Sequence, residues 1–290
     1  MQMIEKAIVK ASQLPCFKNP KDIQPLSGGI TNVNLCISDG GQRFVVRMGT
    51  DIPEHGIMRW NELKLSKAAE AADMSPKVHY NEEGVLVLQY IQAKTYDEKA
   101  VRKPENLERI IKLIKKTHEY TANFLETPIL TFWPFQINRT YIKRLQKNNS
   151  IHCSILPQMQ QNLEKLETAI GPVQLVVGHN DLLAANILDD GNRLWLIDWE
   201  YGGYNSPLFD LAGLASNNSM SKDQELHMLE QYYNHNPAKF WQPYQTMKCV
   251  SLMRETLWSM TAEIFSDIDF DYSSYTSKNL KRFENAFDQI

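Results

Sequence analysis

Four short stretches near the start of the chain are rich in β-branched, aromatic and other apolar residues, and apolar and polar residues alternate in the first of them, which predicts β-strands. The stretches lie at residues 33–37, 44–48, 78–80 and 85–91. The first two are joined by Asp39-Gly40-Gly41, a sequence typical of a tight turn. Apolar residues at helical spacing predict a helix over residues 4–12 and another over about 58–72, which Pro76 follows. We therefore expect a small antiparallel sheet with two helices.

From Pro104 onward, apolar residues recur every three or four positions, which predicts helices. The first of these reaches about residue 125, and its apolar face includes His118, which we interpret as a packed or capping side chain. A packed helix with a solvated basic face is expected within residues 131–148, and a short strand over 173–177. Further helices are predicted over 156–170, 221–233, 238–265 and 277–290. The patterns predict an α+β, bilobal chain, with a sheet lobe over 1–91 and a mostly helical lobe over 92–290.

Composition and charge exclude several classes of protein. The chain has 290 residues, 43% of them hydrophobic, and a net charge of −3 with no long basic block, so nucleic acid is not an expected partner. No apolar run is long enough to span a bilayer, and charges stand where a signal peptide is apolar. The four cysteines are scattered without a C-x-x-C pair, which indicates a reducing compartment. We expect a cytoplasmic protein without a structural zinc site.

Two carboxylates and an amide follow the predicted strand at 173–177. His179-Asn180-Asp181 is followed by four residues and then Asn186, which matches the H-x-D-x-x-x-x-N catalytic loop of kinase-type enzymes. Residues 194–197 are expected to form a buried strand that delivers Asp198 to the place of the kinase metal-binding aspartate, although Trp199 follows it here. In phosphoryl transfer a hydroxyl nucleophile needs an acceptor for its proton, and Asp181 is the candidate.

Asn186 and Asp198 are candidate ligands for Mg²⁺, which prefers carboxylate, amide, water and phosphate oxygens. The sequence Asp189-Asp190-Gly191-Asn192 predicts a tight turn, so residues 187–188 and the strand from Arg193 pair as a hairpin. Such a hairpin brings Asn186 and Asp198 together at its open end. The alternative is an ordinary hairpin with acidic residues on its surface.

These segments, together with Ile197-Asp198-Trp199-Glu200-Tyr201 and Phe209-Asp210-Leu211-Ala212, resemble the choline/ethanolamine kinase family, which is similar in turn to the aminoglycoside phosphotransferases. The resemblance extends over nearly the whole chain, but its specificity lies between residues 178 and 212. It implies a protein-kinase-like fold and an ATP- and Mg²⁺-dependent enzyme that phosphorylates a small molecule. It also implies that Asp210 braces the catalytic loop by accepting backbone hydrogen bonds.

A strand, glycine turn and strand near residue 28 have the layout of a kinase phosphate-covering loop, whose backbone N–H groups and hydroxyls approach phosphate. Its candidate ATP-binding residues are Ser27, Gly28, Gly29, Thr31 and Asn32. Arg47 stands where protein kinases carry the phosphate-contacting lysine, and Glu62 is its expected partner. The resemblance places adenine against the backbone near Gln89 and Ile91. An ordinary hairpin, a solvated Glu62 and an edge-strand Arg47 are the alternatives.

The acceptor site is less sharply indicated. Trp258 and Tyr272 match aromatic positions that form the choline pocket in the family, and Glu200 is a candidate to face a substrate cation. Choline-binding relatives often carry a further tryptophan where this chain has Glu255, and an acidic-aromatic cluster where it has residues 216–219. The aromatic residues also suit an ordinary core.

Choline is the first expected acceptor, with ethanolamine second. Thiamine and aminoglycosides remain alternative acceptors on the same fold. A nucleotide-binding regulator without turnover is the alternative from another class, although Asp181, Asn186 and Asp198 are all present.

Overall fold

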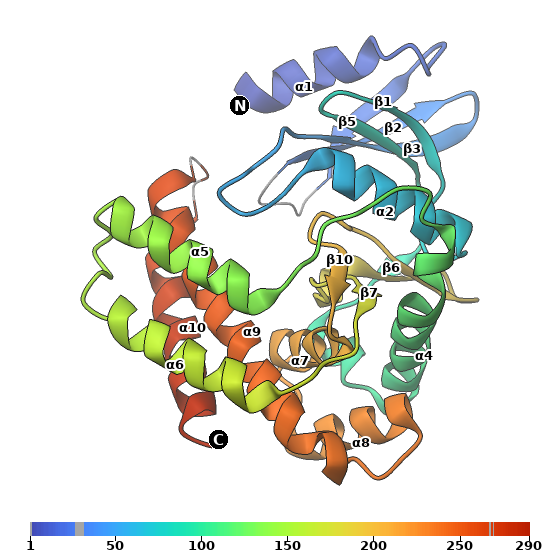
Figure 1. Ribbon diagram of the computed structural model, residues 1–290. Helices are drawn as coiled ribbons and strands as arrows, with labels where there is room; N and C mark the ends of the chain where they lie inside the picture. Colours follow the sequence, from blue (N-terminus) through green and yellow to red (C-terminus); the bar gives the residue numbers. More distant parts are fainter. Residues whose placement is uncertain (1, 27–31, 267, 269) are drawn as a thin grey trace. The chain divides into compact units, whose positions relative to one another are not determined.

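The computed structural model describes residues 2–26, 32–266, 268 and 270–290. The chain divides into two compact units. The sheet unit comprises Met1–Tyr96, Tyr120–Ile129 and Ala185–Tyr201, and the helical unit comprises Asp97–Glu119, Leu130–Ala184 and Gly202–Ile290. Antiparallel strands in one unit and helices in the other agree with the α+β, protein-kinase-like fold predicted from the sequence (Figure 1). The expected lobe boundary after Ile91 stays a prediction.

A five-stranded antiparallel sheet forms the centre of the sheet unit, in the order β1-β2-β3-β5-β4. Its strands are β1 (Lys21–Pro25), β2 (Val33–Asp39), β3 (Gln42–Met48), β4 (Val78–Glu82) and β5 (Val85–Gln89). The helix α1 (Gln2–Ser12) covers one face, where Ala7 and Ala11 are buried against Leu35, Phe44 and Val46. Because side chains alternate across a strand, Arg47 in β3 lies on the opposite face.

The rest of the sheet unit follows β3 and the catalytic segment. The helix α2 (Arg59–Ala71) follows β3, and the 3₁₀ turn η1 (Thr121–Phe124) packs against it. A second sheet holds β6 (Lys94–Thr95), β8 (Ile187–Asp189) and β9 (Leu194–Leu196) in the order β6-β8-β9. Leu196 anchors this sheet, because its N–H donates to the Met74 carbonyl at 2.9 Å and its carbonyl accepts from Ser75 Oγ at 2.9 Å.

The helical unit is organised around α9 (Ala238–Phe265), a helix of 28 residues that is buried along most of its length. It packs against α5 (Pro134–Lys147), α6 (Leu156–Ile170), α7 (Pro207–Asn217), α8 (Lys222–Tyr233) and α10 (Tyr272–Phe287). The helices α3 (Glu98–Val101) and α4 (Pro104–Tyr120) and the antiparallel pair β7 (Val176–Gly178) and β10 (Gly203–Asn205) complete the unit. The turn η2 (Ala184–Asn186) leads along the chain into β8.

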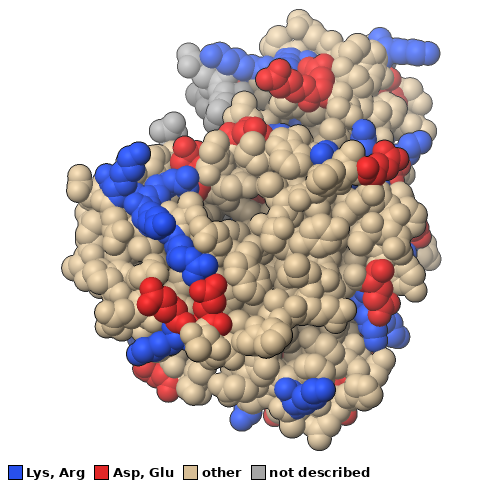
Figure 2. All heavy atoms as spheres, viewed as in Figure 1, with Lys and Arg blue, Asp and Glu red and all other residues tan. Residues whose placement is uncertain are grey.

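The expected basic face is present on α5. Phe135, Tyr141 and Leu145 are buried, whereas Lys143 and Lys147 are exposed. Figure 2 shows Lys and Arg side chains in a row where α5 runs. Arg139 makes ion pairs with Glu167 of α6, with a shortest distance of 2.6 Å. The basic residues of α5 thus belong to a solvated face of a packed helix.

Several elements differ from the sequence prediction, and β1 and α10 show why. The strand β1 was not predicted, because its residues are mostly exposed and its sequence, Lys-Asp-Ile-Gln-Pro, has no alternation of apolar residues. The last helix begins at Tyr272 rather than at Ser277, because Asp271 caps it by accepting a 3.0 Å hydrogen bond from the Ser274 N–H. Among the described residues, no helix is long and apolar enough to cross a membrane.

Candidate active site

Asn186 and Asp198 lie at the open end of the predicted hairpin. Ile187 pairs with Leu196, so Asn186 directly precedes the first paired residue of β8 and Asp198 follows β9 closely. The Ile197 N–H donates to the Asn186 carbonyl at 3.0 Å, which extends the ladder by one bond. Both residues belong to the sheet unit, so this part of the structure brings together the two candidate metal ligands.

The turn of this hairpin is set by Asp190. Its Oδ1 atom accepts from the N–H groups of Asn192 and Arg193, each at 2.8 Å, and its Oδ2 atom accepts from Trp195 Nε1 at 2.8 Å. These hydrogen bonds lower the pKa of Asp190, because they favour the carboxylate. Gly191 takes a φ of 90°, which explains the glycine at the tip. Local turn chemistry therefore positions Asn186 and Asp198.

Arg47 is the centre of a buried ion-pair cluster in the sheet unit, which we call the Arg47 cluster (Arg47, Arg59, Glu62, Asp198 and Glu200). Arg47 Nε lies 2.6 Å from Glu62 Oε1, so the expected pair is present. Arg47 Nη2 lies 2.6 Å from Asp198 Oδ1 and 2.8 Å from Glu200 Oε2. Burial opposes the charge of Arg47, but three adjacent carboxylates outweigh it and raise the pKa of Arg47 above its ordinary value.

Arg59 is a member of this cluster that sequence reasoning missed. Its Nη1 atom lies 2.6 Å from Glu62 Oε2 and 3.0 Å from Glu200 Oε2, and its Nε donates to the Thr50 carbonyl at 3.0 Å. The spacing of three between Arg59 and Glu62 on a helix was a signal for the first of these contacts. The contact with Glu200 spans 141 residues and has no local signal.

The Arg47 cluster holds three carboxylates and two guanidinium groups, so it carries one negative charge in excess when all are ionised. Burial, and then the charge of Asp198, raise the pKa of Glu200, as an excess of negative charge requires. The side chain of Asp198 is 20% exposed, whereas those of Glu62 and Glu200 are 4% and 5% exposed. The excess charge is therefore most accessible at Asp198.

This donor set fits a magnesium ion. Among the described residues, no three His, Cys, Asp or Glu side chains form a metal site on their own. Mg²⁺ usually takes one or two protein oxygens and completes its shell with water and substrate phosphates. One carboxylate beside one amide, next to uncompensated negative charge, satisfies that requirement.

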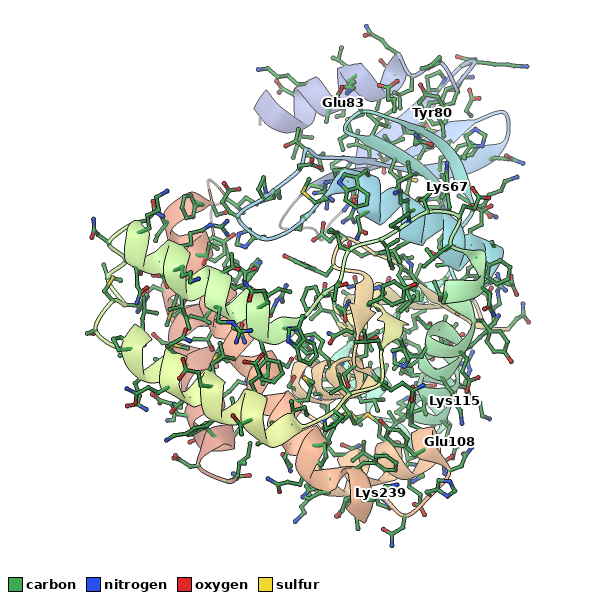
Figure 3. All side chains as sticks on the ribbon, viewed as in Figure 1. Lys67, Tyr80, Glu83, Glu108, Lys115 and Lys239 are labelled. Atoms are coloured by element: carbon green, nitrogen blue, oxygen red, sulfur yellow. The ribbon has the colours of Figure 1, made fainter. Side chains whose placement is uncertain are left out.

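A cavity of about 530 Å³ borders the Arg47 cluster within the sheet unit. Arg47, Arg59 and Glu62 form its charged wall, and the β4–β5 hairpin, including Glu83 (labelled in Figure 3), forms another. Gly49 also lines it, at a place where an added Cβ would lie 3.0 Å from Arg59 Nη2. The cavity shows that Arg59 and Glu62 are reachable from a volume of the size of ligand pockets.

The remaining expected nucleotide contacts are placed as follows. Ser27, Gly28, Gly29 and Thr31 lie outside the described residues. Asn32 directly precedes β2, Gln89 ends β5, and Ile91 follows it as a half-buried residue. Their roles in binding ATP stay predictions.

Asp181 belongs to the helical unit, where Asp210 holds the residues before it. Asp210 Oδ2 accepts from the His179 N–H at 2.8 Å, and Oδ1 accepts from the Asn180 N–H at 2.7 Å. Asn180 has a left-handed φ of 65°, a backbone conformation that residues other than glycine rarely adopt. A Cβ on Gly178 would lie 3.1 Å from Asp210 Oδ2, so this glycine allows the carboxylate to approach the backbone. The brace that the resemblance implied for Asp210 is thus present.

Asn180 is held on its other side as well. Its Nδ2 atom donates to the Gly203 carbonyl at 3.3 Å, and its Oδ1 atom accepts from Asn205 Nδ2 at 3.1 Å. Gly203 and Asn205 are the ends of β10, the strand that pairs with β7. The residue immediately before Asp181 is therefore fixed by both its backbone and its side chain.

Trp258 and Tyr272 come together in the helical unit. With Phe270 and Tyr275 they form an aromatic cluster, in which the ring centroids of Trp258 lie 6.1 Å from Tyr272 and 6.4 Å from Tyr275. Glu255, on the same helix as Trp258, accepts from the Tyr275 hydroxyl at 2.7 Å and from Arg254 Nη1 at 2.9 Å. Glu200, the third expected acceptor contact, is buried in the Arg47 cluster, and its contact with a substrate stays a prediction.

Comparison with known proteins gives a consistent result. The family profile described as choline/ethanolamine kinase matches residues 23–244. Protein LicA of Haemophilus influenzae is 24% identical over 272 residues, which cover 89% of this chain and 97% of LicA. Human ethanolamine kinase 2 is 26% identical over 281 residues, which cover 85% of this chain and 71% of that enzyme.

Solved structures support the same fold. Choline kinase LicA from Streptococcus pneumoniae superposes with a TM-score of 0.83 at 21% identity and covers 100% of both chains. A choline/ethanolamine kinase family protein from Mesorhizobium loti gives a TM-score of 0.78 at 24% identity and covers 98% of this chain and 94% of its own. An aminoglycoside 2'-phosphotransferase gives 0.67 at 12% identity over 99% and 98% of the two chains.

Proposed function

Because the chain belongs to the choline/ethanolamine kinase family, whose members are phosphotransferases that act on an alcohol, we propose that it transfers the γ-phosphoryl group of ATP to a small cationic amino alcohol, with choline as its preferred acceptor. The observation that carries the nucleotide part of this proposal is the excess negative charge of the Arg47 cluster at Asp198. A magnesium–nucleotide complex supplies the cation that such a cluster lacks.

The proposed roles follow from the chemistry of phosphoryl transfer. Asp181 accepts the proton of the acceptor hydroxyl, and Asn186 and Asp198 hold Mg²⁺. When bound, Mg²⁺ neutralises charge on the phosphate oxygens. Arg47 provides a guanidinium group fixed by its ion pairs, and the predicted glycine turn and the backbone near Gln89 and Ile91 hold the rest of the nucleotide.

Two observations favour choline over ethanolamine. A primary ammonium group has three N–H donors that require acceptors, whereas a quaternary ammonium group has none and is recognised by aromatic faces. The carboxylate of Glu255 is already occupied by Arg254 and Tyr275, and that of Glu200 by two arginines. Trp258 and Tyr272 therefore remain as the expected contacts for the cation.

The related enzymes agree with this class of acceptor. LicA from Streptococcus pneumoniae is named a choline kinase, and the human relative an ethanolamine kinase. The likeness to aminoglycoside phosphotransferases concerns the fold alone, at 12% identity. No contact among the described residues favours an aminoglycoside or thiamine over choline.

An acceptor panel tests the proposal. The purified protein is given Mg-ATP with choline, ethanolamine, thiamine or kanamycin, and ADP release is followed for each. We expect the highest kcat/KM for choline and a value about tenfold lower for ethanolamine, the free-energy difference of one cation–π contact. Faster turnover of ethanolamine would overturn the preference for choline, and turnover of kanamycin alone would overturn the proposed acceptor class.

A further inference from the structure

A buried chain of side chains lies behind Asp210 in the helical unit. Tyr232 on α8 places its hydroxyl 2.7 Å from His118 Nδ1, and His118 Nε2 on α4 lies 2.9 Å from Asp210 Oδ2 on α7. All three residues are buried, with exposed fractions of 8%, 5% and 2% for Tyr232, His118 and Asp210. The chain Tyr232–His118–Asp210 thus joins three helices to the backbone just before Asp181.

The chemistry of these three side chains decides which atom donates in each hydrogen bond. An ionised carboxylate only accepts hydrogen bonds, so His118 Nε2 must donate to Asp210. Burial raises the pKa of Tyr232 above its ordinary value, so its hydroxyl keeps its proton and donates a hydrogen bond to His118 Nδ1. This pair of bonds assigns the Nε2–H tautomer to His118.

Asp210 has more donors than a brace of the backbone alone requires. Its two oxygens accept from the N–H groups of His179 and Asn180 and from His118 Nε2. Burial opposes ionisation of Asp210, but the hydrogen bond from His118 is the largest of the opposing effects, and the pKa of Asp210 is lowered. His118 therefore both stabilises the Asp210 carboxylate with a hydrogen bond and fixes the position of the oxygen that holds the His179 N–H.

We infer that His118 and Tyr232 are positioning residues for the proposed base, Asp181, and act through Asp210. This inference rests on the proposed function, because it gives Asp181 the role of base. The carboxylate of Asp181 is placed by the backbone of residues 179–180, and the bond from the Asn180 N–H to Asp210 helps to hold Asn180 in its left-handed φ. A shift of Asp210 is transmitted to Asp181 without a change at the nucleotide or acceptor contacts.

Four variants test the inference. Tyr232→Phe removes one hydroxyl. Tyr233→Phe makes the same change at the next residue, whose ring stacks on Phe240 with centroids 3.6 Å apart. His118→Leu removes the donor to Asp210, whereas His118→Gln keeps an amide N–H near the place of Nε2. For each variant, kcat, the KM for ATP, the KM for the acceptor and the Tm are measured.

We expect Tyr232→Phe to lower kcat about tenfold and His118→Leu about 100-fold, the size of effect that follows a small misplacement of a reacting group. Both KM values stay within about twofold of the wild type, because no binding contact is lost. His118→Gln recovers part of the loss, and Tyr233→Phe keeps the wild-type kcat. The double variant of Tyr232→Phe and His118→Leu is no slower than His118→Leu alone, because the two residues act in one chain.

One result would overturn the inference: a normal kcat for Tyr232→Phe and His118→Gln together with a lowered Tm. The hydrogen bonds among Tyr232, His118 and Asp210 would then contribute to stability only. A rise of KM in step with the fall of kcat also overturns the inference. Asp181→Asn in the same assay separates this failure from that of the proposed function. If Asp181→Asn keeps its turnover, both the role of Asp181 as base and the positioning role of His118 and Tyr232 are wrong. If it is inactive while Tyr232→Phe is normal, only the inference falls.

Discussion

Arg47 Nη2 lies 2.6 Å from Asp198 Oδ1, although 151 residues separate the two in sequence. The same guanidinium group holds Glu62 and Glu200, so a residue of β3, one of α2 and the segment after β9 share one buried charge cluster. The candidate metal ligand is thus oriented by the sheet unit before any nucleotide binds. An enzyme with this arrangement spends little free energy on ordering Asp198 when its substrate arrives.

Asp181→Asn should abolish phosphoryl transfer while leaving nucleotide binding intact. The amide is close in shape to the carboxylate but does not accept the proton of the attacking hydroxyl. We expect kcat to fall by at least about 100-fold. Calorimetric titration of the variant with ATP and Mg²⁺ should give a Kd close to that of the wild type. Near-normal turnover would remove Asp181 from the role of base.

Arg59→Met should destabilise the protein and, because it raises the excess negative charge beside Asp198, strengthen its binding of metal. The change leaves Glu62 and Glu200 with one guanidinium instead of two, and we expect the free energy of unfolding to fall by about 3 kcal/mol. Denaturant unfolding measures this loss. Titration of the nucleotide-free protein with Mn²⁺, followed by electron paramagnetic resonance, measures the metal affinity.

The matched control for Arg59→Met is Lys67→Met. Lys67 is an exposed basic residue on the same helix, α2, and is labelled in Figure 3. Lys67→Met should change the free energy of unfolding by less than about 0.5 kcal/mol, as surface substitutions do. Equal effects of the two substitutions would mean that the cluster around Arg47 does not depend on Arg59.

Trp258→Ala should raise the KM for choline without changing the KM for ATP. Loss of one aromatic face is worth about 1–2 kcal/mol for a desolvated cation, which corresponds to a five- to thirtyfold rise. Trp258→Phe should recover most of the affinity. Tyr120→Ala, which removes an exposed aromatic side chain at the end of α4, serves as the control, and equal changes in both KM values for Trp258→Ala would assign Trp258 to the core.

Asp210→Asn should show a stability loss that depends on pH. The pKa of Asp210 is lowered in the folded protein, so its ionisation favours folding above the ordinary value of about 3.9, and this contribution disappears as the pH falls through the folded-state pKa. We expect the variant to be less stable than the wild type by about 3 kcal/mol at pH 7. The difference in the free energy of unfolding between the variant and the wild type, which we call the stability gap, should become smaller below about pH 4.

Denaturant unfolding at several pH values between neutrality and acid measures this gap. Asp223→Asn, which changes an exposed carboxylate on α8, should alter the stability far less. A gap for Asp210→Asn that stays constant down to the lowest pH would show that the charge of Asp210 does not contribute.

The parts that the sequence predicted well are those whose cause is local. The β8–β9 hairpin follows from Asp190 and Gly191 in its turn, and α6 from the apolar spacing of residues 156–170. The strand β1 and the start of α10 were missed, because an edge strand of exposed residues has no pattern and Asp271 was not recognised as a cap.

The parts of the site that were missed depend on distant contacts. Arg59 meets Glu200 across 141 residues, and Tyr232 meets His118 across 114. Neither pair has a spacing that indicates a contact, and a histidine on an apolar helix face is usually only a core residue. The motif therefore located Asp181, Asn186 and Asp198, whereas the groups that orient their surroundings became visible only in three dimensions.

Asn180 and Asp198 share a left-handed backbone, with φ of 65° and 69°, and each lies at or beside a proposed reacting group. Such a conformation costs about 1 kcal/mol for a residue other than glycine. A library selected only for heat resistance should accordingly enrich glycine at position 198, where it relieves this cost and removes the excess negative charge of the Arg47 cluster, while the selected proteins lose turnover. The most thermostable variants would then be the poorest catalysts, and the conflict between thermal stability and activity would be located at a single residue.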